Sequence, residues 1–166
     1  MISHFIFDAS TLDILTKLGF ALLFGIIIGT ERIISHKAAG MRTYALVSMG
    51  AALFVIISEL IIQKYTLLGM NVGDPLQIPS MIISGIGFMG AGIIIFRDTN
   101  ITGLTTASGL WVAAGIGMAC GVGLFMPAFL ATILTLFVFI VLWQVEQGIK
   151  KIALKPDDKH PDNTHF

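Results

Sequence analysis

Charged residues are scarce in this chain, and cysteine is almost absent. Only 12% of the 166 residues are charged, 55% are hydrophobic, and the mean hydropathy is +0.90. A soluble domain of this length cannot bury so much apolar surface, so the composition predicts an integral membrane protein. The single cysteine, Cys120, excludes a disulfide within the chain, and the histidines are too dispersed to form a zinc site. We therefore expect no bound metal and no other cofactor.

Several further signals are missing. The net charge is zero, which gives no indication of a nucleic-acid partner, and none is expected. The first residues lack the basic segment and the cleavage site of a signal peptide, so the first apolar segment should remain as a helix. No nucleophile is paired with a base, and no motif holds paired acids. We therefore do not expect an enzyme.

Five apolar stretches are long enough to cross a bilayer, which requires about 20 residues. They cover residues 12–30, 44–62, 78–96, 104–121 and 124–144. The last two are nearly continuous, and Gly121, Gly123 and Pro127 favour a tight turn between them. Four spans with one re-entrant piece is the alternative. The sequence thus predicts an all-α, polytopic transmembrane bundle of about five helices.

The basic residues predict the orientation of this bundle. In a five-helix chain, the first loop, the third loop and the tail share one face. Eight of the ten basic residues lie in these three segments, namely Arg32, Lys37, Arg42, Arg97, Lys150, Lys151, Lys155 and Lys159. We therefore expect an extracytoplasmic segment at 1–11, a transmembrane domain at 12–149 and a polar cytoplasmic tail at 150–166. This tail should be disordered or form a brief surface helix.

Glycine is frequent where the predicted helices should pack. It costs helix stability in water, so its density indicates close helix contacts inside a membrane. The candidate packing glycines are Gly25, Gly29, Gly85, Gly87, Gly90, Gly92, Gly109, Gly117 and Gly121. Residues 85–90 also fit the G-x-G-x-x-G dinucleotide pattern, but they lie inside an apolar span and no acid occurs between Asp98 and Glu146. We interpret them as packing residues, or as a helix that opens locally beside a cavity.

Charged and hydroxyl residues gather at the predicted cytoplasmic boundary. The candidate cluster comprises Glu31, Arg32, Arg42, Thr43, Arg97, Asp98, Thr105 and Thr106. Anchoring explains the basic members, but Glu31 should pair with an arginine of this cluster or face a polar cavity. Thr105 or Thr106 should cap the fourth helix, whose positive end favours a carboxylate. Glu59, near the outer end of the second span, is either an ion-pathway acid or an interfacial residue.

Three ordered motifs carry a resemblance to a known family. They are Glu31-Arg32 with Ala39-Gly40-Met41-Arg42-Thr43, then Gly85-x-Gly87-Phe88-x-Gly90-Ala91-Gly92, then Gly103-Leu104-Thr105-Thr106-Ala107 with Trp111. Together they resemble the successive motifs of the MgtC/SapB family, over about residues 19–123. The resemblance implies a bacterial inner-membrane protein of about five transmembrane helices. It covers only the membrane half of the better-known members, which carry a folded cytoplasmic domain after the last helix.

Two functions follow as hypotheses. The family's best-known members are induced in low magnesium and support survival inside host cells, which implies a role in magnesium homeostasis and virulence. The resemblance therefore implies a non-enzymatic protein that modulates other membrane proteins, including the proton-driven ATP synthase. Its partners would be the lipid bilayer, another membrane protein and, through the glycine faces, a second copy of the chain. The alternative is a small oligomeric transporter of magnesium or another ion, with Glu31, Arg97 and Asp98 lining its cytoplasmic vestibule.

Overall fold

The computed structural model describes residues 9–70, 74, 76–97 and 100–153. Asp98 and most of the two terminal segments lie outside these residues. The helices are α1 (Ala9–Ile34), α2 (Met41–Leu67), α3 (Gln77–Ile93), α4 (Leu104–Gly121), α5 (Phe125–Phe137) and α6 (Trp143–Ala153). A π-helical turn, η1 (Val138–Leu142), joins α5 to α6, and two short strands, β1 (Ile95–Arg97) and β2 (Asn100–Thr102), lie between α3 and α4.

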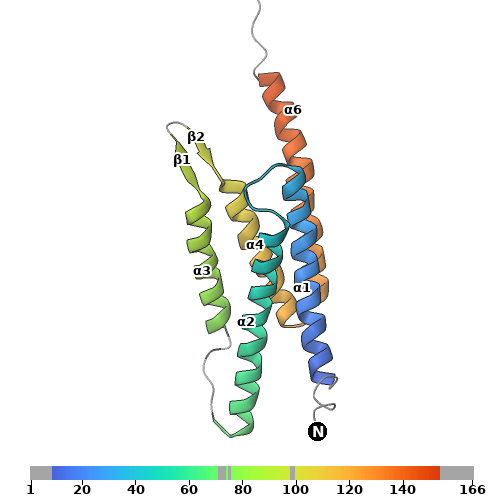
Figure 1. The fold of residues 1–166 in the computed structure, drawn as a ribbon, viewed down its shortest axis with the longest axis vertical. Helices are drawn as coiled ribbons and strands as arrows, with labels where there is room; N and C mark the ends of the chain where they lie inside the picture. Colours follow the sequence, from blue (N-terminus) through green and yellow to red (C-terminus); the bar gives the residue numbers. More distant parts are fainter. Residues whose placement is uncertain (1–8, 71–73, 75, 98–99, 154–166) are drawn as a thin grey trace, which may run out of the picture.

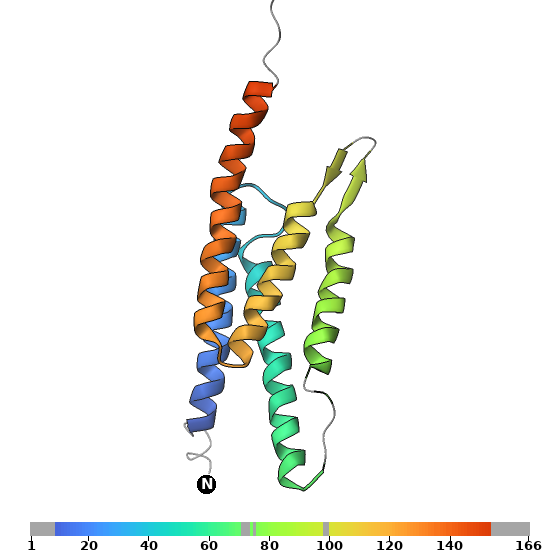
Figure 2. The same ribbon diagram turned by 180° about the vertical axis from the view of Figure 1, so that it is seen from behind.

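The helices run up and down along one axis (Figure 1). The α1–α2 loop, the β1–β2 hairpin and α6 lie at one end, which we call the loop end, and the N-terminus, the α2–α3 connection and the α4–α5 turn lie toward the other (Figures 1 and 2). Within the described residues, α1, α2, α4 and the continuous rod Phe125–Ala153 are long and apolar enough to cross a membrane, whereas α3 has 17 residues. The fold is that of a multi-pass helical membrane protein, as the sequence predicts.

The predicted break between the fourth and fifth spans is a tight turn. Gly123 adopts a positive φ of 80°, and the backbone N–H of Leu124 donates to the carbonyl of Ala119 at 2.8 Å. This geometry closes α4 and starts α5 in the opposite direction (Figure 2). The fourth and fifth apolar stretches are thus two separate helices, while the number of membrane crossings stays a prediction, because α3 is shorter than the other four.

Two predicted boundaries are wrong. The third span was expected to continue to Phe96, but α3 ends at Ile93 because residues 95–97 pair with 100–102 in an antiparallel hairpin. Gly103 then starts α4 with a φ of 90°, where a Cβ would overlap the carbonyl of Ile93. The fifth span was expected to end at Gln144, but the helix continues to Ala153 beyond the bundle.

The core lies around α4, which packs against α1, α2, α3 and α5. Its inward positions hold Leu110, Ala113 and Ile116, all buried, and they meet Phe24 and Ile28 of α1 and Ala52 of α2. By contrast, α3 packs mainly on α4 and touches α2 at few points. The bundle is thus tightly closed on the α1 side and open beside α3.

Candidate functional site

A buried ion pair lies at the loop end, in the last turns of α1. Glu31 and Arg32 are 9% and 1% exposed, and both the Nε and Nη2 atoms of Arg32 contact the Glu31 carboxylate. The hydroxyl of Ser35, one turn further on, donates to the other carboxylate oxygen at 2.6 Å. Removing two charges from water is costly unless each finds partners, so this pair depends on its local geometry.

Phe139 covers the arginine of this pair. The guanidinium carbon of Arg32 lies 3.4 Å from the centroid of the Phe139 ring, a cation–π contact from η1. Gly109 of α4 leaves space for this ring and for the Tyr44 hydroxyl, since a Cβ there would overlap both side chains. A π turn carries one extra residue and changes the direction of the side chains around it, and such turns recur at functional sites.

Arg32 also lines a cavity of about 170 Å³ at the loop end. The Nη1 atom of this arginine is buried and has no hydrogen-bond partner among the residues that the structure describes. The remaining lining residues are Ser35, Lys37, Thr105, Val138, Phe139, Leu142, Trp143 and Glu146. The cavity thus combines a buried cation, polar side chains and one apolar wall.

The other members of the predicted cluster are placed differently. Arg42 is exposed in the first turn of α2, and no ion pair joins it to Glu31 within the described residues. Thr43 is half-buried beside it, while only the backbone of Arg97 is described, in β1. The structure therefore brings Arg32 and Thr105 to one cavity, and Glu31 is connected to it through its ion pair with Arg32.

The expected threonine cap is wrong. The N-cap of α4 is Gly103, and no side chain caps it. Thr105 is exposed and Thr106 is buried, and the carbonyl oxygen of Thr106 accepts a hydrogen bond from the Tyr44 hydroxyl at 3.3 Å. The physical reason is that the hairpin enters α4 through a left-handed residue, a conformation that favours glycine.

The predicted packing glycines of α1 and α4 lie against other parts of this chain. A Cβ at Gly25 would lie 2.6 Å from the carbonyl oxygen of Tyr44, and one at Gly29 would lie 2.5 Å from the Cα of Met41. On α4, a Cβ at Gly117 would overlap the Ser48 carbonyl, and one at Gly121 would lie 2.9 Å from the Ala52 carbonyl oxygen. These positions bring α1 and α4 close to the backbone of α2.

The glycines of α3 are different. A Cβ at Gly90 would contact Ala107 at 3.4 Å, whereas one at Gly85, Gly87 or Gly92 would meet no described atom within 4 Å. The helix is also unbroken through these positions, so it does not open locally. These three glycines therefore leave part of α3 unoccupied.

An apolar groove of about 570 Å³ runs between α2 and α3, and of these three glycines Gly85 lines it. Its walls are formed by Leu46, Val47, Gly50, Ala51 and Phe54 of α2 and by Ile78, Met81, Ile82, Gly85, Ile86 and Met89 of α3. A second cavity, of about 260 Å³, shares Phe54 and Ile78 with the groove and extends it to Ile62. No other helix of the described chain fills this space.

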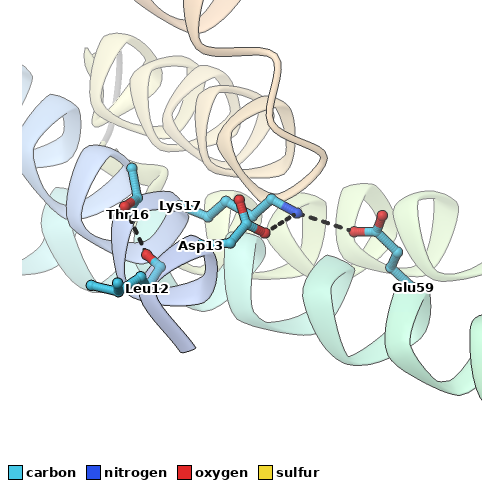
Figure 3. Close-up of polar contacts among 5 residues, drawn as sticks. All are labelled: Leu12, Asp13, Thr16, Lys17 and Glu59. Carbon is cyan, nitrogen blue, oxygen red and sulfur yellow. Dashed lines mark hydrogen bonds and ion pairs between the residues drawn. The ribbon is translucent and has the colours of Figure 1, made fainter. Parts of the chain in front are cut away.

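A second charged group lies at the opposite end (Figure 3). The Lys17 ammonium of α1 lies 3.0 Å from a carboxylate oxygen of Asp13 and 3.4 Å from one of Glu59 on α2. Glu59 thus joins two helices through an ion pair, a role that neither sequence hypothesis for it included. The sequence did contain one indication of this charged group: Asp13 and Lys17 are four residues apart within an apolar segment.

Other residues that pack around the loop-end ion pair could not be identified from the sequence. Phe139 lies within an apolar run, LFVFIVL, in which no spacing marks the residue that meets Arg32. Tyr44 is the first aromatic residue of α2, but its contact with Thr106 spans 62 positions of the chain. Such contacts arise only when the helices pack.

The comparisons place the chain among known proteins. The MgtC family model matches residues 18–148. Protein SapB of Bacillus subtilis is 38% identical over 97 residues, covering 58% of this chain and 42% of SapB. Protein MgtC of Salmonella typhimurium is 40% identical over 137 residues, covering 82% of this chain and 55% of MgtC.

A third relative, from Escherichia coli K12, is named "Putative magnesium transporter YhiD". It is 44% identical over 81 residues, covering 49% of this chain and 38% of YhiD. The matches thus span about half or less of each relative's length. No solved structure matches the chain significantly.

Proposed function

Because this chain belongs to the MgtC family, we propose that it is a non-enzymatic membrane protein that modulates other membrane proteins. The α2–α3 groove carries this proposal. The groove is apolar, and Gly85 in its α3 wall leaves the backbone of this helix accessible. Small residues of this kind let a second helix approach closely within a bilayer. The proposed action is that a transmembrane helix of the target protein binds in this groove.

The length of the groove supports a helix as the occupant. From Leu46 to Ile62 along α2, the groove and the cavity that extends it cover about 24 Å at 1.5 Å per residue. The hydrocarbon core of a bilayer is about 30 Å thick. This surface has nearly that length and is apolar apart from Ser58, Asp74 and Gln77 in the second cavity, so it suits one transmembrane helix.

Photocrosslinking in native membranes tests this proposal. A photoreactive residue at Met89, in the groove wall, is expected to form an adduct with another membrane protein, and antibodies to ATP synthase membrane subunits identify that candidate. Gly85→Leu fills the groove and should reduce the adduct about tenfold or more, because close helix approach is lost.

Gly19→Leu is the matched control, since Gly19 also has open space around it but lies on α1. It should leave the adduct unchanged. If Met89 crosslinks only to lipid, or if both leucine variants behave alike, the groove is not the binding site. An adduct of twice the chain's mass would identify a second copy as the partner.

Ion transport is the second candidate, and the name of YhiD favours it. The Arg32–Glu31 and Lys17–Glu59 pairs lie at opposite ends of the described bundle, with apolar core residues such as Leu110, Ala113 and Ile116 between them. We therefore expect no magnesium flux into proteoliposomes, with or without a membrane potential. A flux that Glu31→Gln abolishes, in protein that remains folded, would favour transport over modulation.

A further inference from the structure

We propose that the loop-end cavity beside Arg32 binds a phosphate group. The arginine at this cavity has an unused hydrogen-bond donor. Arg32 is 1% exposed and uses Nε and Nη2 for Glu31, which leaves Nη1 buried and without a partner among the described residues. A buried, unpaired donor on a charged group is unfavourable, and an oxyanion supplies the missing acceptor.

The charges around the cavity also favour an anion. Lys37 lines it, is exposed, and forms no ion pair within the described residues. Glu146 lines it as well, but Lys150 pairs with this carboxylate. When the ion-pair partners are included, the positive charges are those of Arg32, Lys37 and Lys150, and the negative charges are those of Glu31 and Glu146. One positive charge therefore remains, and it is at Lys37.

The start of α4 adds further donors. Thr105, the second residue of α4, lines the cavity, so the N-terminus of this helix lies beside it. The N-cap glycine supplies no side-chain acceptor, and the first hydrogen bond of this turn is donated by Ala107 to Gly103. The preceding N–H groups lack acceptors within the helix, and helix N-termini of this kind bind phosphate.

The apolar wall indicates where a phosphate group would come from. Leu142, Val138 and Trp143 line the cavity where the rod Phe125–Ala153 leaves the bundle. Tryptophan concentrates at membrane–water interfaces, where phospholipid phosphates lie. A lipid headgroup and a free phosphate ion offer the same oxygens to Arg32 and Lys37, so both sources belong in the test.

Trp143 provides the measurement. The chain has two tryptophans, so Trp111→Phe leaves Trp143 as the sole tryptophan, which can be excited selectively at wavelengths where tyrosine does not absorb. Purified full-length protein is titrated with inorganic phosphate at constant ionic strength, with dihexanoyl phosphatidylglycerol, and with dihexanoyl glycerol, which has no phosphate. We expect a saturable emission change with both phosphate compounds and none with dihexanoyl glycerol. Tighter binding of the lipid identifies a headgroup as the ligand, and tighter binding of phosphate identifies a free ion.

Two charge variants decide whether the cavity is responsible. Lys37→Gln should weaken binding about fivefold, the scale of one exposed ion pair, and it should leave folding intact because Lys37 is exposed. Lys64→Gln, an exposed lysine toward the far end of α2, should have no effect. The proposal is overturned if neither phosphate compound gives a saturable change, or if Lys37→Gln and Lys64→Gln bind with equal affinity.

Discussion

Replacing Gly117 with alanine is expected to destabilise this protein by about 3 kcal/mol, the upper range for overpacking a core. An added Cβ would overlap the Ser48 carbonyl, which belongs to the backbone of α2 and cannot rotate away. The two helices must therefore separate, which also weakens the packing of Ala113 and Cys120 along the same face of α4. Thermal unfolding in detergent, followed by circular dichroism, measures the loss.

Gly115→Ala is the matched control on the same helix. No described atom lies within 4 Å of a Cβ at Gly115, so the substitution meets open space. Alanine also restricts the unfolded backbone and favours a helix, so this variant should be neutral or slightly stabilising. If Gly117→Ala and Gly115→Ala unfold at the same temperature, the close α2–α4 approach is not required for stability.

The glycine pattern shows what the sequence reveals about packing. Small residues recur every four positions on α4, at Gly109, Ala113, Gly117 and Gly121. This spacing places them on one face, and its glycines meet Tyr44, Ser48 and Ala52 of α2. The glycines of α3 look equally suited to contact within the chain, yet a Cβ at Gly85 or Gly87 would meet no described atom within 4 Å. Periodicity identifies a face that admits another helix, but it does not state whether that helix belongs to the same chain.

The spans were predictable because hydropathy and length determine where a chain crosses a membrane. The hairpin was not, since the apolar residues Ile95 and Phe96 continue the composition of α3 without a break. Their departure from the helix depends on pairing with Ile101 and Thr102, a contact between segments. Three-residue strands are also too short to show the two-residue alternation of a strand.

The candidate site was only partly predictable from the sequence, because it too depends on contacts between distant segments. Glu31 is an acidic residue at a membrane boundary, where acidic residues contribute little to the orientation of a membrane protein. Its presence there therefore indicated a partner among the nearby arginines. The sequence left three arginines open, and the structure pairs Glu31 with the adjacent Arg32. The cavity itself depends on Phe139 and Trp143, whose positions follow from the π turn and the packing of α5.

Separating Glu31 from Arg32 is expected to cost about 3–5 kcal/mol of folding stability, as for other buried pairs that lose one member. Glu31→Gln leaves the arginine charge beneath Phe139 without its counterion, and Arg32→Met leaves the carboxylate with Ser35 as its remaining side-chain donor. The double variant removes both charges and should be more stable than the sum of the two single losses predicts. Unfolding temperatures of the four proteins in detergent measure this coupling.

The pair between Glu146 and Lys150 is the control, because it also joins a glutamate to a basic side chain but lies on the exposed surface of α6. Glu146→Gln should leave the unfolding temperature unchanged, since water solvates the lysine that remains. Additive effects at Glu31 and Arg32 would mean that the two side chains do not depend on each other. Non-additivity confined to the buried pair would instead show that the loop end is held by mutual charge compensation, and the Arg32 cavity and its unpaired Nη1 depend on that arrangement.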